Sequence, residues 1–458
     1  MLANGFTERQ ANAAVRKDHR TLIVGLGSTG LSCARLLARE EVSLAVTDTR
    51  ERPPGLAAMK EELPDVALFL GGYDRAVFEA AEQIVISPGV SLREPLIEDA
   101  CARGVPVYGD IELFARRAIA PVIAITGSNG KSTVTTLVGD MLRDAGRVVR
   151  VGGNLGIPAL ELLGDEEPDF YVLELSSFQL ETTGSLDATA AVILNITPDH
   201  MDRYKNLAEY VEAKRRVYKG NGVMVINKDD ALVMASIEPD RRVARFGVST
   251  PPEHDEFGLI EQDGETYLAR GQSALIKLAD LRIKGLHNAA NALAALALVE
   301  AVHIPTESML TTLRRFEGLP HRTQWVAERN AITWYNDSKG TNVGATLAAL
   351  KGMPGKVVLI AGGMGKGQDF SPLREAAKEK ARAVVLIGED AKQIEAALGE
   401  QVAVIHAASM EQAVIAARDA AQSGDAVLLS PACASFDMFK NYEDRGHEFM
   451  EAVKRVLG

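Results

Sequence analysis

A glycine-containing segment at residues 121–133, PVIAITGSNGKST, constrains the fold of this chain more than any other feature. The apolar residues 122–125 predict a buried strand, and the apolar spacing of residues 134–142 predicts a helix directly after the glycines. Such a loop surrounds an anion with backbone N–H groups and a helix N-terminus. Lys131 adds a positive charge and the Ser132 hydroxyl can bind magnesium, so the segment predicts a nucleoside triphosphate site.

The loop is shorter than the common phosphate-binding motif. That motif has four residues between its first glycine and the Gly-Lys pair, which would place a glycine where this chain has Ile125. The alternative is an ordinary helix N-terminus without a ligand. The buried strand before the loop and the amphipathic helix after it favour the phosphate site.

Length and composition limit the possible classes of protein. A chain of 458 residues is too long for one core, so we expect three domains. The net charge of -12 argues against a nucleic acid partner. Three widely spaced cysteines, Cys33, Cys101 and Cys433, fit reduced thiols in the cytoplasm. Residues 1–20 lack the apolar core of a signal peptide, and no apolar stretch is long enough to predict a membrane span.

A nucleotide-binding pattern begins at residue 21. A strand at residues 21–24 precedes GLGSTG at residues 25–30, a helix follows at 31–39, and a second strand at 43–46 leads to Asp48. Asp48 lies at about the distance expected for an acid that binds a ribose. The three glycines favour a ligand over a close helix–strand turn, but they leave NAD and a uridine nucleotide as alternatives. The strand at 84–86 runs into the turn at 87–89, which would share this crevice.

We expect three domains at residues 1–109, 110–318 and 319–458. In the second domain we expect strands at 170–173, 190–194 and 222–226, helices at 207–218 and 289–302, and a small β-rich insertion at 243–283. In the third we expect strands at 332–335, 357–361, 383–387, 402–406 and 426–429, alternating with helices. The predicted fold class is α/β. A Rossmann-like N-terminal domain precedes a central domain like that of P-loop ATPases, with a parallel sheet and a small β insertion, and a Rossmann-like C-terminal domain follows.

Three polar residues of the second domain have both a functional and an ordinary interpretation. Glu174 ends a strand beside the Lys131 loop, where a carboxylate commonly binds magnesium, although a solvent-exposed strand end is the alternative. His200 follows a neighbouring strand, but a lone loop histidine is more often a surface residue. Lys214 lies in EAKRRVY, which is typical of a solvated helix face, and its cation cannot bind magnesium unless the amine forms a carbamate with carbon dioxide.

Taken together, the motifs resemble those of the Mur ligase family over nearly the whole chain. They follow the family's order: GLGSTG (25–30), DTR (48–50), SPG (87–89), GDIELF (109–114), ITGSNGKSTVTTLVG (125–139), GGNLG (152–156), LELSSFQLE (173–181), DHMDRY (199–204), HNAANALAAL (287–296), GLPHR (318–322), NDSKGTN (336–342) and SPACASFDMFKNYEDRG (430–446).

The resemblance implies an ATP-dependent, ADP-forming amide ligase of cytoplasmic peptidoglycan precursor synthesis. Residues 430–446 are similar to the branch that adds D-glutamate to UDP-N-acetylmuramoyl-L-alanine, and the chain lacks the DNPR-like motif of the branch that adds a diamino acid. The substrate carboxylate would attack the γ-phosphate of ATP, and the amine of D-glutamate would then attack the acyl phosphate. The resemblance also implies two Mg2+ ions, and we expect a monomer.

The resemblance further implies a role for each matching residue. The catalytic residues would be Lys131, Glu174, His200 and Lys214, and the magnesium ligands Ser132, Glu174, His200 and Lys214, the last as a carbamate. ATP would be bound by Gly127, Ser128, Asn129, Gly130, Lys131, Ser132, Thr133, Asn288, Asn291, Arg322 and Asp337. The UDP-substrate would be bound by Ser28, Thr29, Thr49, Arg50, Ser87, Pro88, Gly89, Asn154 and His200. The D-glutamate pocket would consist of Lys339, Thr341, Lys366, Ser435 and Tyr442.

Other functions remain open at the level of the sequence. A sibling ligase with a different acceptor, or folylpolyglutamate synthetase, would share the short phosphate loop, although the N-terminal unit argues against the folate enzyme. An NAD-dependent oxidoreductase would use residues 25–30 but leave the phosphate loop without a role. A non-catalytic regulator would bind ATP without forming ADP. Because expected ATP contacts lie on both sides of residue 318, we also predict an open–closed hinge at residues 318–320.

Overall fold

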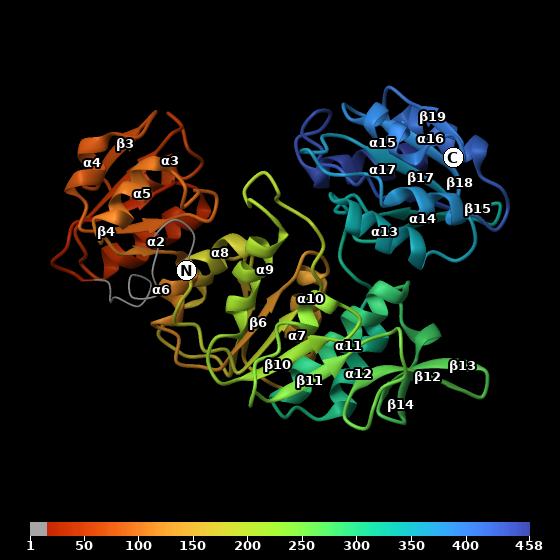
Figure 1. Cartoon of the computed structure of the whole chain (residues 1–458), viewed down its shortest axis with the longest axis horizontal. Coiled ribbons are helices and arrows are strands. Elements are labelled where there is room, and N and C mark those ends of the chain that lie inside the picture. The colour runs from red at the N-terminus through yellow and green to blue at the C-terminus, as the bar shows by residue number, and fades with distance from the viewer. Residues whose placement is uncertain (1–15) are drawn as a thin grey trace.

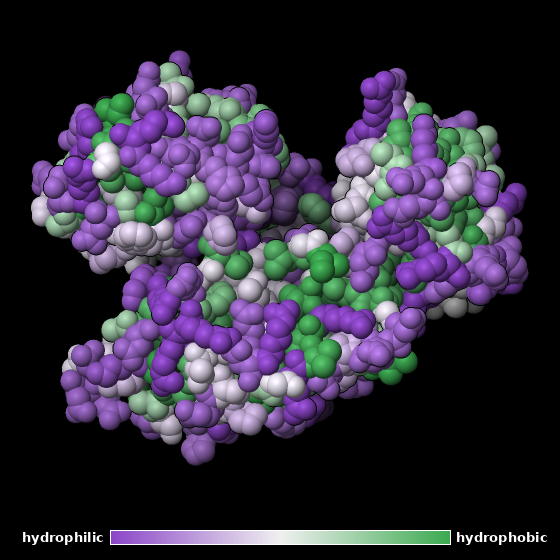
Figure 2. Space-filling view, turned by 180° about the vertical axis from the view of Figure 1, so that it is seen from behind, coloured by the Kyte–Doolittle hydropathy of each residue, from purple (hydrophilic) through white to green (hydrophobic). Residues whose placement is uncertain are grey.

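The structure, a computed structural model, describes residues 16–458 and contains three α/β lobes, each built on its own sheet (Figure 1). The lobes follow one another along the chain, and Figure 2 shows them around a hollow on one face of the molecule. Residues 1–15, which carry most of the stretch where we expected no signal peptide, lie outside the described residues. Within residues 16–458, no helix has the length and apolar character needed to cross a membrane.

The first sheet is parallel throughout, with the strand order β3-β2-β1-β4-β5. Its strands are β1 (Thr21–Val24), β2 (Leu44–Asp48), β3 (Ala67–Leu70), β4 (Gln83–Ile86) and β5 (Val107–Tyr108). Its helices are α2 (Ser28–Arg39), α3 (Leu56–Glu62), α4 (Arg75–Ala80) and α5 (Pro95–Ala102). The chain order reverses between β1 and β4, so the loops after these strands and after β2 border one crevice.

Helix α6 (Asp110–Ala115) joins the first two lobes as a buried element rather than as an exposed linker. The Phe114 ring meets the Tyr171 ring edge-on at 5.0 Å, so α6 packs against the second sheet. One hydrophobic core is continuous from β1 and α2 through α6 into the second sheet. The domain boundaries expected at residues 109 and 318 stay predictions, because packing of this kind does not show which units fold on their own.

The second sheet has nine strands in the order β14-β13-β12-β11-β10-β9-β6-β8-β7. These are β6 (Val122–Thr126), β7 (Val149–Gly153), β8 (Phe170–Glu174), β9 (Ala190–Ile193), β10 (Val223–Asn227), β11 (Val243–Phe246), β12 (Phe257–Gln262), β13 (Glu265–Arg270) and β14 (Ser273–Lys277). The lobe also contains α7 (Lys131–Asp144), η2 (Ala159–Leu162), α8 (Ser177–Glu181), α9 (Leu207–Arg215), η3 (Arg216–Tyr218), α10 (Ala231–Met234), η4 (Leu278–Asp280), α11 (Leu286–Ala301) and α12 (Thr306–Arg315).

The β-rich segment expected at residues 243–283 is present and continues the second sheet. Strand β11 pairs parallel with β10, and β12 follows β11 before the antiparallel pairs of β12 with β13 and of β13 with β14. Alternating apolar residues predict strands, but they do not say which neighbour a strand pairs with. The strands were therefore expected and their place in the sheet was not.

The third sheet has the order β15-β16-β20-β17-β18-β19, in which only β15 is antiparallel to its neighbour. Its strands are β15 (Gln324–Arg329), β16 (Ile332–Asn336), β17 (Val357–Gly362), β18 (Ala381–Ile387), β19 (Val404–His406) and β20 (Ala426–Leu429). Its helices are α13 (Val343–Gly352), α14 (Leu373–Lys380), α15 (Ala391–Leu398), α16 (Met410–Ala420) and α17 (Tyr442–Leu457). Separate apolar cores lie on the two faces of this sheet, as expected for a parallel sheet covered by helices. The predicted α/β class with three parts is confirmed.

Candidate functional site

The phosphate loop connects β6 to the N-terminus of α7, as the sequence predicts. Gly130 has φ +84°, and a Cβ there would lie 2.4 Å from Asn291 Oδ1, so a side chain at this position would be both strained and blocked. The loop is held from behind by residues after β9, since Ser128 N donates to Asn195 O at 2.9 Å. The first-turn N–H groups of α7 have no acceptor within the helix and are suited to bind an anion.

Lys131 folds back over its own loop. Its Nζ donates to Gly127 O and to Ser128 O, each at 2.9 Å. Burial lowers the pKa of the Lys131 amine, while the nearby carboxylates of Glu174 and Asp199 oppose that shift. From the third lobe, Arg322 Nη2 donates to Ser132 Oγ at 2.6 Å, so two cations from different lobes meet at the loop.

Glu174 is the last residue of β8, and it faces the phosphate loop with one unused acceptor. Its Oε1 accepts from Asn154 Nδ2 at 2.8 Å. Its Oε2 is buried and has no hydrogen-bond partner. An unpaired buried carboxylate oxygen is costly, so this atom is suited to a ligand that brings positive charge.

Lys214 is buried at the start of the phosphate loop rather than on a solvated helix face. Its Nζ donates to Gly127 O at 2.9 Å and to Thr126 Oγ1 at 3.4 Å, and it lies 4.6 Å from the centre of the Tyr210 ring. Within the described part of the chain it makes no ion pair. Burial, and next the Lys131 cation, hold the pKa of the Lys214 amine well below its ordinary value.

His200 projects from the loop after β9 in a left-handed backbone conformation, with φ +56°. Such a conformation is uncommon for a residue with a side chain and is often found at functional sites. The imidazole meets the Phe178 ring at 4.7 Å between centroids and remains partly open to solvent. Burial lowers the pKa of His200, and the nearby Asp199 carboxylate opposes this.

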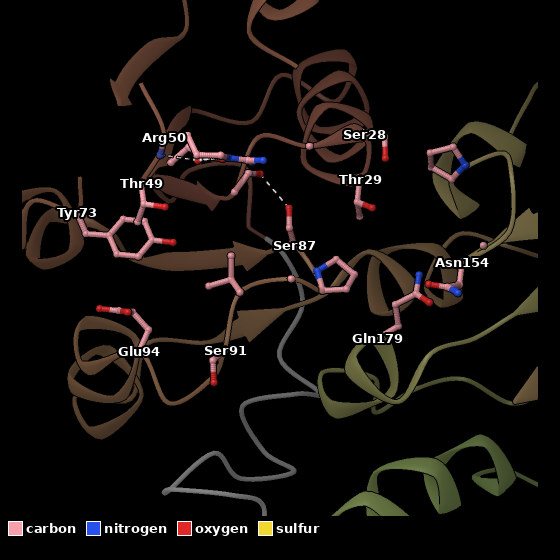
Figure 3. Close-up of a pocket in the computed structure, with 18 of the residues that line it drawn as sticks. Ser28, Thr29, Thr49, Arg50, Tyr73, Ser87, Ser91, Glu94, Asn154 and Gln179 are labelled. Atoms are coloured by element: carbon pink, nitrogen blue, oxygen red, sulfur yellow. Dashed lines mark hydrogen bonds and ion pairs between the residues drawn. The ribbon is translucent and has the colours of Figure 1, made fainter. Parts of the chain in front are cut away.

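The first pocket, with a volume of about 600 Å³, lies between the first and second lobes. Figure 3 shows Thr49, Arg50 and Tyr73 on one side of it and Asn154 and Gln179 on the other. Its lining contains the expected residues Ser28, Thr29, Thr49, Arg50, Ser87, Pro88, Gly89 and Asn154, whereas His200, the other residue expected to bind the UDP-substrate, lines the central pocket. The N-terminus of α2 points into this space, which favours an anionic group such as a diphosphate.

The Asp48 carboxylate, which the sequence pattern suggests as a ribose ligand, is occupied by hydrogen bonds within the protein. Its Oδ2 accepts from Leu26 N at 2.7 Å, its Oδ1 accepts from Arg50 N at 2.9 Å, and both oxygens bind the Arg50 guanidinium. Burial raises the pKa of Asp48, but these donors outweigh it and lower the pKa to about 2. Asp48 therefore fixes the glycine loop and Arg50, and a ribose would have to compete with these bonds.

The central pocket, with a volume of about 830 Å³, lies between the second and third lobes. It brings together most of the residues expected around the reacting groups: Ser128, Asn129, Gly130, Lys131, Ser132, Asn154, Glu174, His200, Arg322, Lys339, Thr341, Lys366 and Tyr442. Asn154 and Gly156 line both the first and the central pocket. One elongated ligand could therefore extend from one pocket into the other.

The lateral pocket, with a volume of about 250 Å³, opens beside the phosphate loop. It contains the expected residues Asn129, Gly130, Thr133, Asn288, Asn291, Arg322 and Asp337. Asp337 accepts from Thr323 N at 3.1 Å and from Ser430 Oγ at 2.7 Å, and burial raises its pKa to about 6. A nucleotide whose phosphates occupy the loop would place its base and sugar here.

The cationic end of the central pocket is built by the third lobe. Lys339 Nζ lies 3.8 Å from the centre of the Tyr442 ring, which gives this aromatic residue a contact in the site. Burial, and next the Arg322 cation, lower the pKa of Lys339 to about 8. Lys366 has φ +53° and lines the same pocket. Two ammonium groups at this end favour an acceptor that carries carboxylates.

Three expected residues lie outside the linings of these pockets. Gly127 begins the phosphate loop, and the buried Lys214 donates to its carbonyl oxygen. Ser435 is also buried, and its backbone oxygen accepts from Met438 N and Phe439 N. Within residues 16–458, no group of three or more His, Cys, Asp or Glu side chains is arranged to hold a metal. The expected magnesium ligands include a serine and a lysine, and so they are not a cluster of this kind.

The sequence alone did not identify several lining residues. Tyr73, Ser91 and Glu94 line the first pocket, Asn342 and Gln368 the central pocket, and Asn227, Phe246 and His287 the lateral pocket. Asn227 ends β10, so the rule that ligands bind at the carboxyl ends of strands could have found it. Tyr73 lies between β3 and α4, and no local pattern there indicates a ligand.

Comparison with known families covers the same three parts of the chain. Residues 19–109 match the model described as Mur ligase MurD-like, N-terminal domain. Residues 125–299 match the Mur ligase middle domain, and residues 321–433 match the Mur ligase, glutamate ligase domain.

Individual relatives are similar over nearly their full length. The UDP-N-acetylmuramoylalanine--D-glutamate ligase of Nitrosococcus oceani is 58% identical over 439 residues, covering 95% of this chain and 97% of the relative. The protein of the same name from Methylobacillus flagellatus is 54% identical over 440 residues, covering 95% and 97%. Among solved structures, the UDP-N-acetylmuramate-alanine ligase MurC of Thermotoga maritima has a TM-score of 0.60 at 18% identity, covering 96% of this chain and all of that one, which supports the fold.

Proposed function

This chain belongs to the Mur ligase family, and we propose that it joins D-glutamate to UDP-N-acetylmuramoyl-L-alanine in peptidoglycan precursor synthesis, forming ADP and phosphate from ATP. One observation carries the proposal. A pocket suited to a UDP-sugar, a phosphate loop and a cationic acceptor end all open onto the same central pocket.

The three substrates occupy different parts of the connected pockets. ATP lies in the lateral pocket with its phosphates on the loop at residues 127–133, and Arg322 and Asp337 complete its site from the third lobe. The uridine diphosphate lies in the first pocket, between the N-terminus of α2 and the turn at residues 87–89. The muramoyl-L-alanine arm passes Asn154 into the central pocket, where its carboxylate meets the γ-phosphate.

The chain's own cations support phosphoryl transfer. A carboxylate becomes an acyl donor when its oxygen attacks the γ-phosphorus and ADP leaves, which spreads negative charge over the transferred group. Lys131 and Arg322 lie where they can neutralise that charge without moving far. The amine of D-glutamate then attacks the acyl carbon, phosphate leaves, and Lys339 and Lys366 hold the carboxylates of the acceptor.

The residues near the phosphate loop fit a magnesium ion. Glu174 Oε2 is buried without a partner, Glu174 and Ser132 line the same central pocket, and hydroxyl and carboxylate oxygens are the ligands that magnesium prefers. We propose Ser132 and Glu174 as ligands of the ion that accompanies ATP, and His200 and carbamylated Lys214 as ligands of the second ion. Bound there, the ions would neutralise charge on the phosphates and on the substrate carboxylate.

The surroundings of Lys214 support its proposed carbamylation. Its amine is buried against carbonyl and hydroxyl oxygens, beside Lys131, and makes no ion pair with a described residue. The Lys214 ammonium first loses one proton, and attack of the neutral amine on carbon dioxide then releases a second, so that a carbamate anion replaces a cation next to Lys131. That exchange removes a like-charge contact and supplies a carboxylate-type oxygen ligand.

We propose the cytoplasm as the place of reaction, because ATP and UDP-sugars are available there and the three cysteines form no disulfide within residues 16–458. We also propose that a monomer suffices, since the linings of all three pockets come from one chain.

The N-terminal Mur ligase match at residues 19–109 disfavours a folate substrate, and the phosphate loop disfavours an oxidoreductase.

The test is phosphate release from ATP and Mg2+ with UDP-N-acetylmuramoyl-L-alanine, in parallel with D-glutamate, L-glutamate, a diamino acid or no amino acid. We expect release only when the UDP-substrate and D-glutamate are both present. Release with a different amino acid would keep the family and change the branch. ATP binding without release under any condition would favour the regulator.

A further inference from the structure

One arginine outside all three pockets ties the first pocket to the His200 loop. Arg203 belongs to the loop after β9, whereas residues 87–90 follow β4 of the first sheet. Arg203 Nη1 donates to Pro88 O at 2.8 Å, and its Nη2 donates to Val90 O at 3.1 Å. The guanidinium thus holds two backbone carbonyls, one in the turn at residues 87–89 and one directly after it, beside the proposed uridine diphosphate site.

The same guanidinium also contacts the ring that supports His200. Its central carbon lies 4.1 Å from the centre of the Phe178 ring, and the His200 imidazole meets that ring edge-on at 4.7 Å. A backbone hydrogen bond also links the two residues directly, because Arg203 N donates to His200 O at 2.9 Å. A continuous series of contacts therefore runs from the turn through Arg203 and Phe178 to His200.

This connection is rigid and partly desolvated. Arg203 pairs with Glu181 at 2.8 Å, and the two side chains are 12% and 15% exposed. A second arginine holds the loop itself, since Arg93 donates to Arg203 O at 2.8 Å and to Glu209 at 2.6 Å. A planar guanidinium can hold two carbonyls, a carboxylate and an aromatic face at once, whereas an ammonium group cannot reproduce that geometry.

We propose that Arg203 is a positioning residue that fixes the separation between the bound UDP group and His200. The proposal rests on the proposed function, in which one substrate extends from the first pocket into the central pocket. If its UDP end is held by the turn and its carboxylate must meet the γ-phosphate, a shift of the turn relative to the His200 loop misplaces the carboxylate. A misplacement of about 1 Å can reduce a rate about 100-fold.

The experiment compares Arg203→Met with Arg241→Met. Arg241 is a matched control, because it is 13% exposed and donates to Tyr218 O and Gly222 O, with Glu238 beside it, away from the three pockets. We expect Arg203→Met to lower kcat about 30-fold, with the Kd of UDP and the KM of ATP changed by less than about threefold. Arg203→Lys should recover only part of kcat, and Arg241→Met should leave kcat and both affinities near the wild-type values.

The following results would overturn the proposed role of Arg203. Equal turnover of Arg203→Met and Arg241→Met would overturn the proposal, and so would a parallel loss of UDP binding, ATP affinity and melting temperature, which indicates a structural role. If Arg203→Met does not fold, Phe178→Leu leaves the bonds to the turn in place and should lower kcat about tenfold with unchanged UDP binding. Normal kcat in Phe178→Leu would then overturn it. A wild-type protein that releases no phosphate would contradict the proposed function instead.

Discussion

Lys214 is a residue whose chemistry depends on its surroundings more than on its sequence neighbours. EAKRRVY reads as a solvated basic face, yet Lys214 is 1% exposed and donates to the phosphate loop. We expect Lys214→Ala to lower kcat about 100-fold or more, because it removes a proposed ligand of the second magnesium ion. Steady-state phosphate release measures the effect, with the exposed Lys60→Ala as a control.

A second readout tests the carbamate without turnover. Protein equilibrated with 13C-bicarbonate should show a carbamate carbon signal by NMR that Lys214→Ala lacks and Lys60→Ala retains. Activity of Lys214→Ala close to the wild-type value, or a carbamate signal that survives the substitution, would contradict the assignment.

Because Asp110 is buried, its ionisation should make the stability of the folded protein depend on pH. Burial raises its pKa from 3.8 to about 6, and its Oδ1 has no hydrogen-bond partner. The stability that the neutral acid contributes is complete below about pH 4 and is lost as the pH rises through about 6. Asp110→Asn should therefore raise the melting temperature at pH 8 by about 2–4 °C, and less at pH 5.

The control for this prediction is Asp99→Asn, since Asp99 is an exposed carboxylate paired with Arg75. Its effect should not grow between pH 5 and pH 8. A gain from Asp110→Asn that is independent of pH would show that the carboxyl is not neutralised in the folded protein.

Among the elements, α6 connects two lobes through one buried carboxylate. Glu112 Oε2 accepts from Gly184 N at 2.7 Å and from Ser185 N at 2.9 Å, and Oε1 accepts from Ser185 Oγ and pairs with Arg116. Glu112→Ala leaves the backbone N–H groups of Gly184 and Ser185 without their acceptor and removes the ion pair with Arg116. We expect a loss of about 3 kcal/mol in the free energy of unfolding, measured by urea denaturation.

The control variant for Glu112→Ala is Glu62→Ala, which breaks the partly exposed ion pair between Glu62 and Arg35. That change should lower the free energy of unfolding much less than Glu112→Ala does, because solvent screens the pair. Equal losses in the two variants would mean that the Glu112 network does not hold α6 to residues 184–185.

The extent of sequence-based prediction differs between elements. Residues 21–24 and 426–429 were expected as strands and form β1 and β20, because short apolar runs between turn residues specify buried strands. The phosphate loop could be predicted because its glycines and Lys131 form a recognisable local pattern. Strand β15 was missed, since an antiparallel edge strand carries polar residues and no continuous apolar run.

The site was less predictable where it depends on long-range packing. Glu174 could be placed because it ends a strand beside the loop, whereas its unpaired oxygen follows only from the tertiary structure. The positions of Gly127, Lys214 and Ser435 outside the pocket linings, and the part that Tyr73 takes in the first pocket, depend on contacts between segments far apart in the sequence. Periodicity carries no information about such contacts.

At the scale of the whole molecule, the proposed ATP site is divided between two lobes. Arg322 reaches Ser132, and Asn342 Nδ2 donates to Asn129 Oδ1 and to Asp199 Oδ2, each at 3.2 Å. We predict closure about residues 318–320, where Gly318 has φ +86°, when both nucleotide substrates bind. Small-angle scattering should show a smaller radius of gyration with a non-hydrolysable ATP analogue and the UDP-substrate together than with UDP alone. An unchanged radius would contradict a hinge at this place.

The central claim is that the three pockets form one site in which the substrate carboxylate is activated by phosphorylation. The most direct test uses UDP-N-acetylmuramoyl-L-alanine labelled with 18O in the alanine carboxylate, together with ATP, Mg2+ and D-glutamate. The account predicts that one 18O atom per turnover appears in the released phosphate, because the attacking oxygen leaves with the phosphoryl group. Phosphate that forms alongside amide product without 18O would contradict it.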